Sequence, residues 1–101
     1  MNLSINAAAR AELLEAAAWY EAISSSLGAD LLEAFDDGVG RIVALPHAWH
    51  PLGNELRRFR LTRFPYGIIY RCRGDDITIV AFAHHKRRAL YWQDRLRDLN
   101  D

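Results

Sequence analysis

A cluster of histidine, arginine and tyrosine near the end of the sequence contains the side chains best suited to chemistry. His84 and Arg87 are three positions apart, and Tyr91 follows four positions later. Histidine transfers protons near neutral pH, and the planar guanidinium of arginine donates parallel hydrogen bonds to phosphate. These ingredients would suit metal-independent cleavage of RNA through its 2′-hydroxyl. His84 or Tyr91 would then transfer protons, and Arg87 would stabilise the phosphate charge.

A wider basic segment surrounds these three candidate catalytic residues. The stretch from Glu55 to Arg97 holds eleven of the thirteen Lys and Arg residues against four acids, a net charge of +7, whereas residues 1–54 carry a net charge of −5. The neutral total therefore conceals two oppositely charged halves, and such asymmetry indicates an acidic partner. Binding to something acidic is favoured over RNA cleavage on the residues alone, because arginine at alternate strand positions is also typical of a solvated face. The candidate binding residues are Arg58, Arg60, Arg71, Arg73, Arg88 and Trp92.

Several other classes of site lack their residues. The sequence contains no paired carboxylates, no Ser-His-Asp set, no glycine-rich phosphate loop and no metal motif. His47 and His50 have no further ligands at a recognised spacing, so neither a metal nor a cofactor is expected. Cys72 is the single cysteine and is interpreted as a small strand residue. The acidic N-terminal stretch resembles no signal peptide and no apolar run is long enough to cross a membrane, which predicts a cytoplasmic protein without a membrane partner.

Two amphipathic helices are predicted in the N-terminal half. An alanine-rich segment with apolar residues at three- and four-residue steps predicts a first helix from Ser4, its N-cap, to about Ser26. Gly28 suits the left-handed residue that follows a helix end. A second helix is predicted from Asp30 to Leu45, because Pro46 disfavours helical geometry in the residue before it. The two helices would form a hairpin whose apolar stripes cover a sheet.

The remaining chain predicts that sheet. Residues 46–53 are predicted to be a loop, followed by antiparallel strands over 55–63, 67–73 and 77–83, of which the last is the most apolar and is expected to be central. Residues 90–100 predict a short closing helix. The expected fold is therefore α+β, with an N-terminal helical hairpin packed on a small antiparallel β-sheet and a short C-terminal helix. Residues 1–101 are expected to form a single domain.

Three groups of residues in this order resemble the RelE/ParE toxin family. They are the segment from Leu61 to Tyr70 with Phe-Pro-Tyr at 64–66, the strand ending in His84-x-x-Arg87-Arg88, and Tyr91-Trp92-x-x-Arg95. The resemblance covers nearly the whole chain. It implies the toxin half of a bacterial type II toxin–antitoxin operon, of the kind linked to plasmid stabilisation. It also implies growth inhibition and a cognate antitoxin that masks the toxin and alone connects it to DNA.

The family divides into two activities, and the resemblance leaves both open. RelE-like members cut messenger RNA in the ribosome, and the matching positions here would be Arg60, Arg71, His84, Arg87 and Tyr91. ParE-like members lack that set and poison DNA gyrase by protein–protein contact. Lys86 is the only lysine and the net charge is zero, which favours the ParE-like activity. A third possibility is an inactive homologue that acts only in the antitoxin complex.

Overall fold

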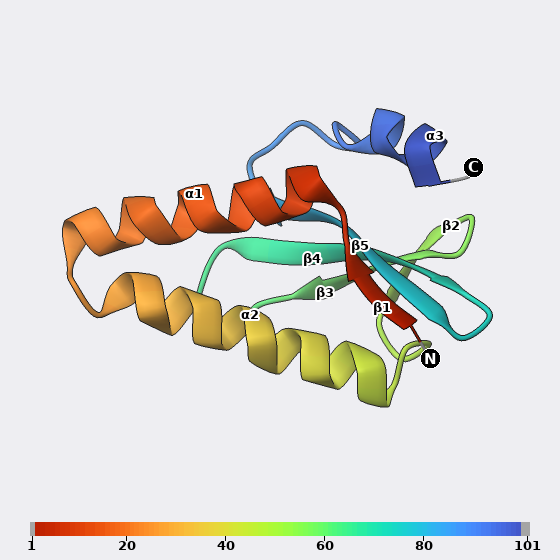
Figure 1. Cartoon of the computed structure of the whole chain (residues 1–101), viewed down its shortest axis with the longest axis horizontal. Coiled ribbons are helices and arrows are strands. Elements are labelled where there is room, and N and C mark those ends of the chain that lie inside the picture. The colour runs from red at the N-terminus through yellow and green to blue at the C-terminus, as the bar shows by residue number, and fades with distance from the viewer. Residues whose placement is uncertain (1, 100–101) are drawn as a thin grey trace.

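The chain folds as a five-stranded sheet with a helical hairpin on one face, as a computed structural model describing residues 2–99 shows (Figure 1). The strand order is β1-β5-β4-β3-β2. All neighbouring strands are antiparallel except β1 and β5, which are parallel. The predicted α+β fold is therefore confirmed. The elements are β1 (Asn2–Ile5), α1 (Ala7–Ile23), α2 (Leu27–Ala44), β2 (His50–Gly53), β3 (Leu56–Arg60), β4 (Tyr66–Arg73), β5 (Asp76–His84), the 3₁₀ turn η1 (Gln93–Arg95) and α3 (Leu96–Leu99).

The first helix begins later than the sequence predicted. Its N-cap is Asn6, whose side-chain oxygen accepts a hydrogen bond from the Ala8 N–H at 2.8 Å. The prediction of Ser4 as N-cap was wrong, because Ser4 lies in β1 and pairs with Thr78 of β5. A four-residue strand leaves little periodicity to read, and serine is a preferred N-cap residue, so the local signal favoured a helix start.

The second helix begins earlier than predicted, and the expected role of Gly28 was wrong. Gly28 is a buried residue inside the first turn of α2, where a Cβ atom would lie 2.7 Å from the carbonyl oxygen of Ala17. This glycine therefore lets the two helices approach closely rather than ending the first one. Asp30, predicted as the cap, lies in the first turn of α2.

The sheet contains the three predicted strands and two short ones that the sequence analysis missed. Residues 50–53, predicted as loop, form β2 and pair with β3. The middle position belongs to β4 rather than to β5, because β1 adds a further strand beyond β5. β5 is nevertheless buried on both faces, as its apolar run predicted.

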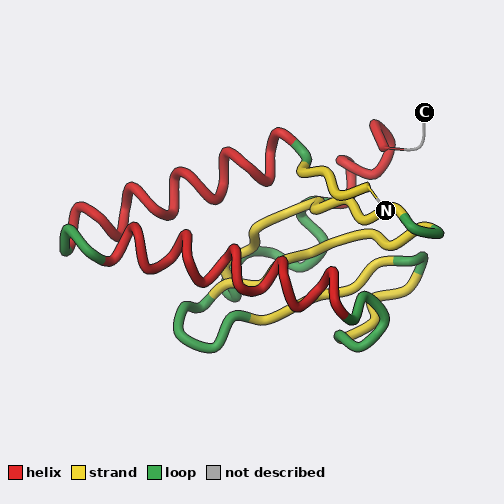
Figure 2. Tube along the Cα trace, turned by 60° about the horizontal axis from the view of Figure 1, so that its bottom comes forward, coloured by secondary structure: helices red, strands yellow, loops and turns green. Residues whose placement is uncertain are grey.

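Two clusters of buried side chains lie on the two faces of this sheet. The helical hairpin packs on the inner face, where Leu13, Phe35 and Tyr70 belong to one core, and Figure 2 shows both helices lying across the strands. The C-terminal segment covers the outer face, where Ile69, Val80 and Trp92 belong to the second core. The predicted closing helix is shorter than expected, with a 3₁₀ turn followed by four helical residues, and its predicted end at residue 100 lies outside the described residues. None of the described helices has the length and apolar character needed to cross a membrane.

Candidate functional site

The three candidate catalytic residues lie together where β5 ends and the chain turns toward the outer face. The Arg87 guanidinium carbon lies 3.8 Å from the centroid of the Tyr91 ring, so the cation stacks on the phenol. The Nδ1 of His84 accepts a hydrogen bond from the Lys86 N–H at 3.0 Å. The His84 ring also meets the Tyr66 ring edge-on, with 5.0 Å between centroids. The sequence-based grouping therefore corresponds to one place in the structure.

The Tyr91 hydroxyl is engaged by a residue that sequence reasoning missed. It donates a 2.5 Å hydrogen bond to Oε2 of Glu12 on α1. Arg95 completes the network, because its Nη1 and Nη2 donate to the two Glu12 oxygens at 2.8 and 3.1 Å. Both charged side chains are largely buried, with 16% of the Glu12 side chain and 21% of the Arg95 side chain exposed. Glu12 and Tyr91 are 79 positions apart, and no local pattern connects them.

The side chains of Glu12 and Arg95 also bond to backbone groups of β5 that, in the described part of the chain, have no strand beside them on that edge. β1 ends at Ile5, which pairs with Ile79 of β5. The next backbone groups of β5 bond to side chains instead, since the Phe82 N–H donates to Glu12 at 3.1 Å and the Val80 carbonyl accepts from Arg95 at 3.1 Å. Buried backbone groups need such partners. The Glu12–Arg95 pair is thus part of the structural frame of the sheet.

The pKa values in this network follow from burial and hydrogen bonding. Burial raises the pKa of Tyr91, and its hydrogen bond to the Glu12 carboxylate raises the pKa further. Burial alone would raise the pKa of Glu12, but the hydrogen bonds from Arg95, Tyr91 and the Phe82 N–H, together with the Arg95 charge, outweigh it, so the net pKa is lowered. The hydrogen bond to Glu12 is the main cause of the raised pKa of Arg95. The network therefore holds Glu12 ionised and Tyr91 protonated.

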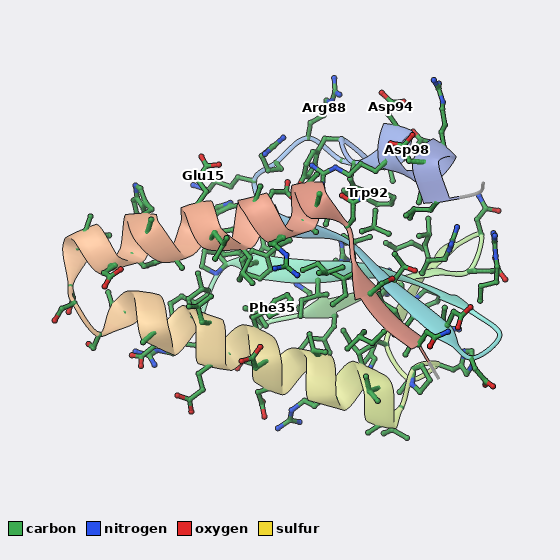
Figure 3. The ribbon with its side chains drawn as sticks, viewed as in Figure 1. Glu15, Phe35, Arg88, Trp92, Asp94 and Asp98 are labelled. Carbon is green, nitrogen blue, oxygen red and sulfur yellow. The ribbon has the colours of Figure 1, made fainter. Side chains whose placement is uncertain are left out.

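The predicted binding residues separate into different environments. Two arginines have structural bonds, because Arg71 donates from Nη2 to the Leu99 carbonyl at 3.2 Å and Arg73 pairs with Glu55 at 2.9 Å. Trp92 is 4% exposed and belongs to the outer core, so its ring offers no free stacking surface. Figure 3 shows Trp92 between the C-terminal segment and the sheet, whereas Arg88 points away from the protein.

The other two predicted binding residues, Arg58 and Arg60, lie side by side on β3. A hydrogen bond of 3.4 Å joins Arg60 Nη2 to the Nδ1 atom of His85. Burial is the main reason that the pKa of His85 is lowered, and the positive charge of Arg60 lowers it further. The basic residues therefore concentrate at the end of β5 and on β3.

An aromatic groove of 530 Å³ runs between α1 and the end of β5. Tyr66 and Phe82 stack at 4.6 Å between centroids with an interplanar angle of 6°. Trp19 on α1 lines the opposite wall and is 62% exposed. No role was predicted for Trp19, because its exposure beside other aromatic rings depends on the packing of α1 against the sheet. The lining residues are Glu12, Glu15, Ala16, Trp19, Tyr20, Pro65, Tyr66, Phe82, His84 and Arg87.

This arrangement is better equipped for contact than for proton transfer. Arg87 and His84 face the groove and could hold an anionic group. The Tyr91 hydroxyl, however, is a donor to a carboxylate, and Arg87 covers the Tyr91 ring. An exposed tryptophan beside other aromatic rings is typical of an interface anchor. The geometry thus offers a binding surface with charged rims.

Comparison with known proteins agrees with this fold. Residues 3–89 match the family described as "ParE toxin of type II toxin-antitoxin system, parDE". Among solved structures, the chain is similar to one titled "Chromosomal ParDE TA system from P. aeruginosa", with a TM-score of 0.62 and 23% sequence identity over 83% of this chain and 95% of that chain. No curated protein sequence matches the chain. Since the family match spans most of its length, the chain belongs to the ParE toxin family and is the toxin component of a type II toxin–antitoxin system, with an antitoxin as its class of partner.

Proposed function

We propose that this toxin inhibits bacterial growth by binding DNA gyrase through protein–protein contact, without cleaving RNA. The observation that carries the proposal is the Tyr91 hydroxyl, which donates to Glu12 instead of facing an open site. A phenol whose pKa is raised by burial and by a neighbouring carboxylate is a poor general base. The protein acts in the cytoplasm, and a cognate antitoxin neutralises it, as in systems that stabilise plasmids.

The groove supports contact as the mode of action. Trp19 is the most exposed aromatic side chain on its wall, and it lies beside Tyr20 with 5.0 Å between ring centroids. Tryptophan and tyrosine are enriched among the residues that dominate binding energy at protein interfaces. Glu15 and Arg87 place opposite charges among the lining residues, which gives a partner segment a defined orientation.

Supercoiling by purified DNA gyrase, measured with increasing toxin, tests the proposal directly. We expect supercoiling to fall with toxin concentration and the antitoxin to restore it. Three variants, His84→Ala, Arg87→Ala and Tyr91→Phe, address cleavage in the same experiment. We expect the Tyr91→Phe protein to retain inhibition in proportion to its folded fraction, since the phenol takes no part in chemistry.

Induction of the toxin in a bacterium separates the competing activities. DNA damage signalling with intact messages supports gyrase binding. Message cleavage during translation that is lost in the His84→Ala, Arg87→Ala and Tyr91→Phe variants would contradict the gyrase proposal. It would indicate a RelE-like, ribosome-dependent endonuclease instead. Growth that continues normally, with unchanged supercoiling, would identify an inactive homologue that works only in the antitoxin complex.

A further inference from the structure

A second pocket lies on the outer face of the sheet, on the side away from the helical hairpin. Its floor contains a small residue, Ala83 of β5, whose register partner is Gly67 of β4. The Arg58 stem covers Gly67, whereas the short side chain of Ala83 leaves a space that a larger residue would fill. The C-terminal segment walls this space, and the pocket has a volume of 260 Å³.

The pocket combines an apolar interior with a basic rim. The apolar lining residues are Leu52, Ile69, Ala83, Ala89, Leu90 and Trp92. The basic lining residues are Arg58, His84, His85, Arg87 and Arg88. None of the lining residues that the structure describes is acidic, so the rim carries uncompensated positive charge.

Arg58 is the best-positioned cation of this rim. Its stem is held against Gly67, where an added Cβ atom would lie 3.2 Å from Cγ and 3.3 Å from Cδ of Arg58. Its Nε atom is buried and has no hydrogen-bond partner among residues 2–99. Within the same described residues, no carboxylate pairs with Arg58, Arg87 or Arg88. A buried, unsatisfied donor on a fixed guanidinium gains a bond when an oxyanion arrives.

The apolar part of the pocket decides which anion fits. A nucleic-acid base needs an aromatic face to stack on. Trp92 is buried in the outer core, and the Arg87 guanidinium covers the Tyr91 ring at 3.8 Å, so neither ring offers one. Aliphatic walls made by Leu52 and Ile69, with the half-exposed Leu90 at the rim, suit an aliphatic side chain instead.

We propose that this outer pocket binds a peptide segment in which a carboxylate side chain adjoins an aliphatic one, and that the antitoxin supplies the segment. The aliphatic side chain enters the space above Ala83, beside the Arg58 stem that covers Gly67, and the carboxylate accepts hydrogen bonds from Arg58 and the neighbouring arginines. The source of the segment rests on the proposed neutralisation by an antitoxin, whereas the chemistry of the pocket does not. The pocket opens on the outer face and the aromatic groove lies beside α1, although His84 and Arg87 line both.

Fluorescence anisotropy with the full chain and three probes tests the pocket. The probes are a short peptide of alternating leucine and glutamate, its leucine–glutamine counterpart, and a single-stranded oligonucleotide. Of the three probes, we expect tight binding for the leucine–glutamate peptide and weak binding for the other two. Arg58→Gln should weaken that binding roughly tenfold, the equivalent of one lost charge-assisted hydrogen bond. Ala83→Leu should weaken it at least as much by filling the floor while leaving every charge in place.

Arg10→Gln is the matched control, because it removes one positive charge from an exposed position on α1. Equal weakening by Arg10→Gln and Arg58→Gln would reduce the effect to overall charge and overturn the proposal. Full binding by the Ala83→Leu protein, preferential binding of the oligonucleotide, or failure of every probe would overturn it as well. Thermal unfolding of each variant confirms that it is folded. A supercoiling assay on the same proteins keeps this result separate from the gyrase proposal, since peptide binding is readable whether or not gyrase is inhibited.

Discussion

Glu12 and Arg95, 83 positions apart in the chain, form a two-pronged ion pair in which Nη1 and Nη2 of Arg95 meet the two carboxylate oxygens at 2.8 and 3.1 Å. This pair connects the first helix to the C-terminal segment. It also bonds to the backbone of Phe82 and Val80 just beyond the point where β1 stops pairing with β5. A residue that a sequence reader would place on a solvated helix face is therefore central to the assembly of the sheet.

Removing this pair should destabilise the whole domain. We expect Glu12→Gln to lower the free energy of unfolding by about 2–3 kcal/mol, because several charge-assisted hydrogen bonds are weakened in a site that is largely buried. Arg41→Gln is the control, since Arg41 and Asp37 form an exposed pair on α2 at 3.2 Å. Its effect should stay within about 0.5 kcal/mol. Urea unfolding of both proteins measures the difference, and equal effects would contradict a structural role for Glu12.

Acid should weaken the wild-type protein through the same carboxylate. The pKa of Glu12 in the folded protein is lowered from 4.5, so folding favours the ionised form. The resulting stabilisation is fully present above pH 4.5 and is lost as the pH falls through the lowered folded pKa. We expect Glu12→Gln to lack this component, giving a flatter dependence of unfolding free energy on pH in that window. Glu33→Gln, which removes an exposed carboxylate of α2, controls for net charge. A wild-type slope in the Glu12→Gln protein would contradict the assignment.

Two glycines of α2 should respond to alanine in opposite directions. At Gly28 a methyl group would lie 2.7 Å from the Ala17 carbonyl oxygen and 2.9 Å from Cβ of Glu21, so the helices would have to separate. We expect Gly28→Ala to cost about 1–3 kcal/mol of stability through overpacking. At Gly40 no atom lies within 4 Å of the added position. Gly40→Ala should therefore stabilise the helix by about 0.5–1 kcal/mol. Thermal unfolding of the pair checks both signs.

The sequence predicted the long elements well and the long-range contacts poorly. Helical periodicity over 7–23 and the apolar run of β5 are local signals, and both elements were found. The four-residue strands β1 and β2 have too few residues to show alternation, and each gains its stability from a neighbour distant in the chain. The local pattern around Gly28 favoured a turn, whereas packing against α1 placed this residue inside a helix.

The candidate site shows the same division between local and distant information. His84, Arg87 and Tyr91 line one pocket, and their proximity was readable because they follow one another closely in the sequence at the end of β5. The state of the Tyr91 hydroxyl was not readable, because it depends on Glu12 across 79 positions. The basic composition also does not indicate which arginines already have structural partners, as Arg71 and Arg73 do.

The exposed tryptophan of the groove provides the sharpest test of contact as the mode of action. Trp19 contributes little to the core, since 62% of it is exposed and its ring packs edge-on against that of Tyr20 with 5.0 Å between centroids. We expect Trp19→Ala to leave the unfolding temperature nearly unchanged while weakening inhibition of gyrase more than tenfold, the loss typical of a central aromatic anchor.

Leu14→Ala is the matched control, because Leu14 is a similarly exposed apolar residue of the same helix, at 55%, that does not line the groove. Inhibition curves for the two variants against the wild type decide the matter. If both variants inhibit gyrase as well as the wild type does, the groove is not the surface that contacts gyrase. If both variants lose inhibition to the same extent, the contact uses the whole exposed apolar surface of α1 rather than the groove alone.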